Sequence, residues 1–73
     1  MELNEIQSIT NKVIEVKYFD LIKKHLKSIS NIAALGECTM ALDFTIENSQ
    51  IAMYLKRKGF DVDYIDLKII IRW

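Results

Sequence analysis

The feature that most constrains the fold of this chain is its C-terminal segment, residues 59–73, with the sequence GFDVDYIDLKIIIRW. Gly59 follows a helix-favouring stretch, and glycine most readily adopts the left-handed conformation that ends a helix. Two short segments rich in β-branched and aromatic residues come next, separated by a turn at Ile65 and Asp66. This pattern predicts a helix stop followed by a β-hairpin. It specifies an architecture and carries no catalytic signature.

The N-terminal half of the chain favours helix from about residue 4 to residue 35, and Gly36 supplies its stop. Placed at about 100° per residue, its apolar residues fall into two stripes on opposite sides, although a helix packed on one sheet needs only one stripe. The surplus stripe consists of Ile6, Ile9, Val13 and Val16. We therefore expect either a helix break near Thr10 and Asn11 or packing of this half on another subunit. Residues 1–12 are the expected protruding or oligomerising arm.

The middle of the chain predicts a strand and a second helix. Residues 37–44 alternate in polarity, as a half-buried strand does, with an apolar side formed by Cys38, Met40, Leu42 and Phe44. Thr45 is the expected cap of a helix that runs to Lys58 and turns inward Ile51, Ala52 and Leu55. We expect the first strand to pair with the last. The predicted fold is a single α+β domain, residues 1–73, of order α-β-α-β-β, in which two helices, the first long, pack on a small three-stranded antiparallel sheet.

The charge balance and the single cysteine argue against several classes of protein. Ten Lys and Arg residues balance ten Asp and Glu residues, so there is no basic field to hold duplex nucleic acid. No apolar run approaches the length of a membrane span, and the acidic N-terminus is unlike a signal peptide. Cys38 has no disulfide partner, and no metal or cofactor site is expected. We therefore expect a cytoplasmic protein with a reduced, buried thiol, whose small core favours a homo-oligomer, most simply a dimer.

No set of side chains predicts catalysis. His25 lies among lysines with no carboxylate three or four residues away, so we expect a solvated histidine rather than a general base. Asp61 and Asp63 are expected to pair with Lys68 or Arg72 across the hairpin rather than to bind a cation. Enzymatic activity is therefore the least expected class of function.

One group of residues has the chemistry of recognition. Arginines bind phosphate or carboxylate groups in a bidentate manner, and aromatic rings stack on bases or guanidinium groups. The candidate residues for binding a ligand or partner are Tyr54, Lys56, Arg57, Arg72 and Trp73. In the alternative interpretation, the basic residues offset the helix dipole and Trp73 packs in the core between the hairpin and a helix.

Several short motifs carry a resemblance to a known group of proteins. The first helix ends in Ala33, Ala34, Gly36 and Glu37, the second ends in Leu55, Gly59 and Phe60, and Val62 precedes a closing Ile71 and Trp73. In this arrangement the chain resembles small accessory proteins of tailed phages of Firmicute hosts. It departs from them in a turn without an Asn-Gly pair and in Arg72, which stands where a small residue is common. The resemblance implies an accessory protein made inside the host cell, and it transfers no catalytic residue.

Two mechanisms of different classes fit these expectations. In the first, a homo-oligomer docks an apolar or edge-strand surface on a host protein or defence factor and inhibits it, as in host takeover or counter-defence. In the second, an oligomeric sponge sequesters an anionic signalling nucleotide with Lys56, Arg57, Arg72 and an aromatic platform. A minor virion or assembly protein is a third alternative.

Overall fold

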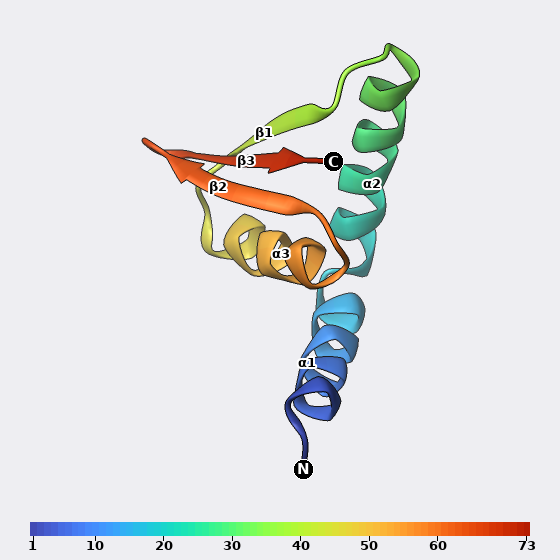
Figure 1. The fold of residues 1–73 in the computed structure, drawn as a ribbon, viewed down its shortest axis with the longest axis vertical. Coiled ribbons are helices and arrows are strands. Elements are labelled where there is room, and N and C mark those ends of the chain that lie inside the picture. Colours follow the sequence, from blue (N-terminus) through green and yellow to red (C-terminus); the bar gives the residue numbers. More distant parts are fainter.

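The computed structural model describes residues 1–73 and shows the predicted α+β fold, with three helices and a three-stranded antiparallel sheet (Figure 1). The elements are α1 (Leu3–Lys17), α2 (Phe19–Ala34), β1 (Thr39–Asp43), α3 (Ile46–Arg57), β2 (Asp61–Ile65) and β3 (Lys68–Arg72). The strand order is β1-β3-β2, so the first strand pairs with the last, as predicted. Helices α2 and α3 pack on the sheet, whereas α1 extends away from it and contacts α2 and α3.

The long N-terminal helical segment breaks at Tyr18, which corrects the predicted break near Thr10 and Asn11. Tyr18 has φ −118° and ψ 32°, and its hydroxyl donates a hydrogen bond to Gln50 at 2.6 Å. A straight helix over residues 3–34 would be about 48 Å long, longer than the whole molecule, whose longest dimension is 41 Å. The break lets both halves of the segment contribute to one core, with Ile14 buried in α1 and Ile22 buried in α2.

Both glycines end helices as predicted. Gly36 has φ 83° and Gly59 has φ 107°, in the left-handed region. After α3 the amide of Phe60 donates to the carbonyl of Leu55 at 3.1 Å, which completes a Schellman motif. At its other end, the hydroxyl of Thr45 accepts a hydrogen bond from the amide of Asn48 at 3.0 Å, so Thr45 caps α3.

The core lies between one face of the sheet and the two helices that cover it. Its fully buried side chains are Ile51 and Leu55 of α3 and Ile69 and Ile71 of β3. Only 11 of the 73 residues are buried, so the core is small, as expected for a domain of this length. None of the helices combines the length and the apolar character needed to cross a membrane.

Two residues lie elsewhere than the sequence predicts. Cys38 is exposed: β1 begins at Thr39, two residues after the predicted start of the strand at residue 37, so the thiol lies outside the strand. His25, expected to be solvated, is buried because it falls on the same side of α2 as Ile22 and Ile29. Its Nε2 lies 3.0 Å from Oδ1 of Asn48, in a hydrogen bond that ties α2 to the first turn of α3.

The hairpin forms as predicted, with its two-residue turn at Asp66 and Leu67, one position later than expected. Asp66 has φ 54°, a left-handed conformation that aspartate tolerates better than most residues. Arg72 pairs with Asp63 across the hairpin, as predicted, whereas Lys68 pairs with Asp43 of β1.

Candidate protein-binding surface

Two of the five predicted recognition residues hold α1 against α3. The hydroxyl of Tyr54 donates a hydrogen bond to Glu15 at 2.7 Å, and Nε of Arg57 donates to Oδ1 of Asn11 at 2.5 Å. Lys58 adds an ion pair with Glu15 at 3.8 Å. The hydroxyl of Tyr54 and Nε of Arg57 are therefore engaged within the chain, where they link α1 to α3.

The environment of Tyr54 explains its role in this contact. Burial raises the pKa of Tyr54 to about 12, and the hydrogen bond and negative charge of Glu15 act in the same direction. A phenol with so high a pKa is neutral at physiological pH and acts as a hydrogen-bond donor. Tyr54 is thus suited to anchoring α1 by donating to Glu15.

The other three recognition residues lie elsewhere. Arg72 pairs with Asp63 on the sheet face opposite the core. Trp73 is 38% exposed and packs edge to face on Phe60, with ring centroids 6.5 Å apart. Lys56 is exposed and forms no ion pair. Because the five residues do not converge within one chain, an anion pocket built from them would need a second subunit.

The surplus stripe predicted from the sequence lies open on α1. We call it the α1 stripe; its members are Ile6, Ile9, Val13 and Val16, exposed by 47%, 53%, 57% and 72%. At about 100° per residue these side chains point away from the buried side of α1, where Ile14 contacts the core. No part of the chain covers the stripe.

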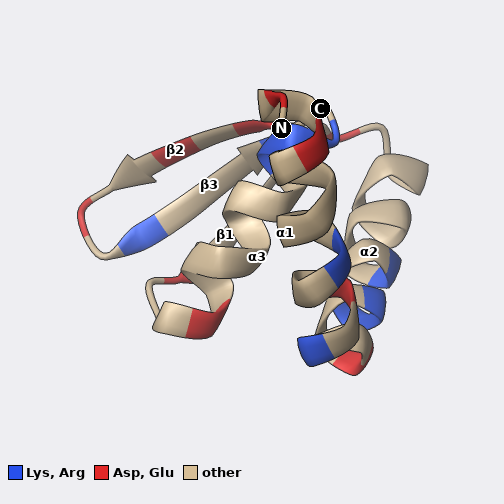
Figure 2. Cartoon of the chain, turned by 90° about the horizontal axis from the view of Figure 1, so that it is seen from below, with Lys and Arg blue, Asp and Glu red and all other residues tan.

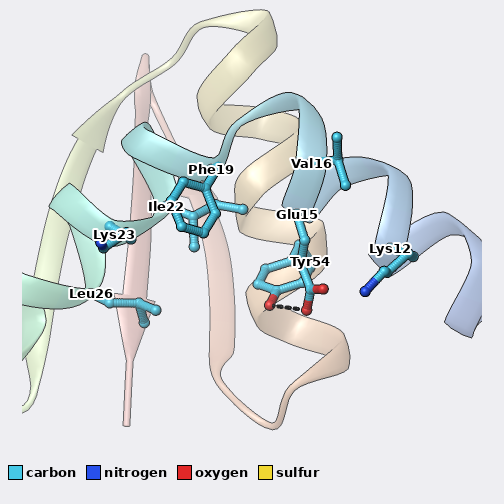
Figure 3. Close-up of a pocket in the computed structure, with 8 residues that line it drawn as sticks. All are labelled: Lys12, Glu15, Val16, Phe19, Ile22, Lys23, Leu26 and Tyr54. Atoms are coloured by element: carbon cyan, nitrogen blue, oxygen red, sulfur yellow. Dashed lines mark hydrogen bonds between the residues drawn. The ribbon is translucent and has the colours of Figure 1, made fainter.

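A groove lies beside the α1 stripe where α1 meets α2 (Figure 3). Its volume is about 530 Å³, and its lining consists of Lys12, Glu15, Val16, Phe19, Ile22, Lys23, Leu26 and Tyr54. Val16 belongs to both the stripe and the groove, so the two apolar surfaces are continuous. Lys12 and Lys23 lie on opposite sides of the groove. The sequence did not predict it because its lining comes from three helices and depends on the break at Tyr18.

A second exposed apolar surface lies at the turn of the hairpin, and we call it the hairpin-tip cluster: Phe44, Tyr64 and Leu67. The rings of Phe44 and Tyr64 pack edge to face with centroids 5.9 Å apart. The amide of Phe44 donates to the carbonyl of Leu67 at 3.1 Å. The alternating pattern predicts all three on the core side of the sheet, but their exposure shows that the helices do not cover this end. One feature of the sequence could have pointed to apolar residues at this end of the sheet: Phe44 and Ile46, both apolar, flank Thr45, the cap of α3.

The α1 stripe and the hairpin-tip cluster differ in the charged residues that lie nearby. Acidic residues follow β2 and the hairpin turn, with Asp61, Asp63 and Asp66, whereas lysines gather on α2 (Figure 2). No group of three or more His, Cys, Asp or Glu residues lies close enough together to hold a metal ion. The exposed apolar side chains of the α1 stripe and the hairpin-tip cluster have charged residues beside them. An apolar centre with a polar rim is the usual composition of a protein interface. Comparisons with protein-family models, with curated proteins and with solved structures found no match for this chain.

Proposed function

We propose that this chain is a small protein-binding module that self-associates and inhibits another protein by occupying its surface. The observation that carries the proposal is the exposure of two separate apolar surfaces, the α1 stripe and the hairpin-tip cluster. Contiguous apolar side chains left open on a small domain are typical of surfaces that bind proteins. The resemblance to tailed-phage accessory proteins suggests the class of target, a host enzyme or defence factor in the host cytoplasm.

The two surfaces suit different partners. The α1 stripe is aliphatic and lies on one regular helix, which suits packing on a helix of a second copy. The hairpin-tip cluster contains two aromatic rings, a residue type enriched at the centre of protein interfaces. It also lies where the edge strands β1 and β2 leave backbone groups unpaired. We therefore assign self-association to the stripe and target binding to the cluster.

The experiment that tests target binding compares the wild type with two lysine variants. Tyr64→Lys places a charge in the hairpin-tip cluster, and Ser30→Lys places the same charge on an exposed position of α2. Each protein is immobilised and exposed to host lysate, and any retained polypeptide is purified and titrated against the three proteins by calorimetry. We expect one polypeptide to bind the wild type and Ser30→Lys at a fixed stoichiometry, to lose its own activity on binding, and to bind Tyr64→Lys at least about tenfold more weakly.

Two outcomes would contradict the proposal. Equal retention of every polypeptide by all three proteins would show that the cluster binds no specific target. A nucleotide released in stoichiometric amount on denaturation of the purified wild type would instead support the sponge.

A further inference from the structure

We propose that a polar recess between α1 and the C-terminal end of α3 binds a small soluble molecule through its phosphate group. The volume of the recess is about 570 Å³, and Ile9 is the one apolar residue of its lining. The site lies beyond the proposed function, because the hairpin-tip cluster is at the other end of α3, a helix of 12 residues and about 18 Å. Three properties of the recess support a phosphate ligand: its charge, its unused hydrogen-bond donors and its size.

Positive charge exceeds negative charge in the recess. Lys12 of α1 and Arg57 and Lys58 at the end of α3 line it, and Glu15 is the only carboxylate. Glu15 already accepts a hydrogen bond from Tyr54 at 2.7 Å and lies 3.8 Å from Lys58. Three cations and one carboxylate, with about half a negative charge from the C-terminal end of the helix dipole, give a net charge of about +1.5. A phosphomonoester, which carries about −1.5 to −2 at neutral pH, neutralises this charge.

The side chains of the recess keep donors that nothing else in the chain uses. Nε of Arg57 donates to Oδ1 of Asn11 at 2.5 Å, which holds the guanidinium at the wall of the recess. The two terminal nitrogens of Arg57 have no hydrogen-bond or ion-pair partner in the chain, and neither does Lys12. Two neighbouring N–H groups of a guanidinium bind a phosphate in a bidentate manner. The amide nitrogen of Asn11 remains a further donor, because its oxygen accepts from Arg57.

The size and the polar lining leave room for more than a phosphate ion. The wall that α1 contributes carries neutral polar side chains, spaced so that they share one side of the helix: Asn4, Gln7, Ser8 and Asn11. Their amide and hydroxyl groups suit a polar ligand and add no charge. Small-molecule sites usually have volumes of about 300–1,000 Å³, and the recess falls in this range. The ligand class is therefore a small phosphate compound with a polar body, such as a nucleoside monophosphate or a sugar phosphate.

The recess differs from the recognition site expected from the sequence. Of the five predicted recognition residues only Arg57 lines it. Lys12 comes from the other end of the sequence, and packing of α1 on α3 brings it to the same recess. A ligand held by both helices binds the folded chain and stabilises it, so the urea midpoint should rise with ligand concentration.

Nuclear magnetic resonance titration of the full chain tests the site. Adenosine monophosphate, glucose 6-phosphate and inorganic phosphate are added at a constant ionic strength of about 0.15 M, which screens weak contacts with exposed lysines. We expect saturable shifts of the amides of residues 4–12 and 57–59, and a Kd at least about tenfold higher for adenosine or glucose than for its phosphate. The compound with the lowest Kd identifies the ligand as a nucleotide, a sugar phosphate or the free ion. Absence of saturation by all three up to about 10 mM would rule out the site.

Matched removals of charge separate the recess from the rest of the surface. Lys12 and Lys24 are both exposed lysines without an ion pair, but only Lys12 lines the recess. We expect Lys12→Gln and Arg57→Gln to raise the Kd at least about fivefold, and Lys24→Gln to stay within about twofold of the wild type. Circular dichroism checks the fold of Arg57→Gln, and Lys12→Gln keeps the test decisive because it removes no contact within the chain. Equal effects of Lys12→Gln and Lys24→Gln would overturn the assignment to the recess.

The phosphate site and the proposed function fail separately. Tyr64→Lys should bind the phosphate compound as the wild type does, and Lys12→Gln should bind the target as the wild type does. Loss of phosphate binding in Tyr64→Lys as large as in Lys12→Gln would contradict the position of the site. A ligand in this open recess exchanges with solvent and is lost on dialysis, whereas a sponge would release its nucleotide only on denaturation.

Discussion

Val13 and Ile14 are adjacent in α1 but have opposite environments, which makes them a matched pair for testing self-association. Val13 is 57% exposed in the α1 stripe, and Ile14 is 9% exposed in the core. Val13→Asp should leave the fold of one chain intact and change its free energy of unfolding by no more than about 0.5 kcal/mol. Ile14→Ala should lower that free energy by about 2–5 kcal/mol, because it removes buried methyl groups.

The effect of Val13→Asp on the dimer can be worked out from the exposure of the side chain. Full burial of a valine contributes about 1.5 kcal/mol, so covering the exposed 57% contributes about 1 kcal/mol per copy. The introduced carboxylate loses part of its hydration in the contact, which costs at least about 1 kcal/mol more per copy. For two copies the sum is at least about 4 kcal/mol, or a roughly thousandfold weaker Kd.

Sedimentation velocity over a range of concentrations measures this change, and circular dichroism reports the secondary structure. Urea unfolding is carried out on dilute samples, since dimerisation stabilises the folded state in a concentration-dependent way. We expect a dimeric wild type, a monomeric Val13→Asp with the wild-type spectrum, and an Ile14→Ala that unfolds at lower urea. A monomeric wild type, or a Val13→Asp dimer as tight as the wild type, would refute the assignment of the α1 stripe.

Three further predictions follow from single residues. Because the pKa of Tyr54 in the folded state is raised to about 12 from 10.0, the free energy of unfolding should fall as pH rises from about 10 to 12. The increase in tyrosinate absorbance that Tyr54 gives near pH 12 should be missing in Tyr54→Phe. Deletion of Trp73 should lower the unfolding free energy in urea by about 1–2 kcal/mol, less than for a fully buried tryptophan, since it is 38% exposed; a loss above about 3 kcal/mol would place it in the core. Cys38 should react with a thiol reagent in the native protein within about tenfold of its rate in urea, because it is exposed; strong protection would contradict its position.

The parts of the fold that follow local rules were predictable from the sequence. Gly36 and Gly59 end helices because few other residues adopt positive φ without strain, and Thr45 caps α3 through its own hydroxyl. The hairpin follows from the short connection between two β-favouring segments. The α1 stripe was also predictable, because the spacing of its four residues depends on the helix alone.

Other features depend on tertiary contacts and could not be derived from local patterns. Tyr18, where the helical segment breaks, donates a hydrogen bond to Gln50, which lies 32 positions away. The hydrogen-bond partner of His25 is Asn48, at the start of another helix and 23 positions away. The groove forms only where α1, α2 and α3 meet, which depends on how the three helices pack. The exposure of the hairpin-tip cluster depends on how much of the sheet α3 covers.

The proposed dimer has a consequence for target binding. The α1 stripe and the hairpin-tip cluster lie on separate parts of the chain, so packing through α1 leaves the cluster of each copy uncovered (Figure 1). A two-fold dimer therefore presents two identical target sites. Binding of the second site to a dimeric or closely spaced target becomes intramolecular, which raises the overall affinity without any new contact. Val13→Asp should then weaken binding to such a target while leaving the affinity for an isolated target subunit unchanged, a difference that no direct contact of Val13 with the target would produce.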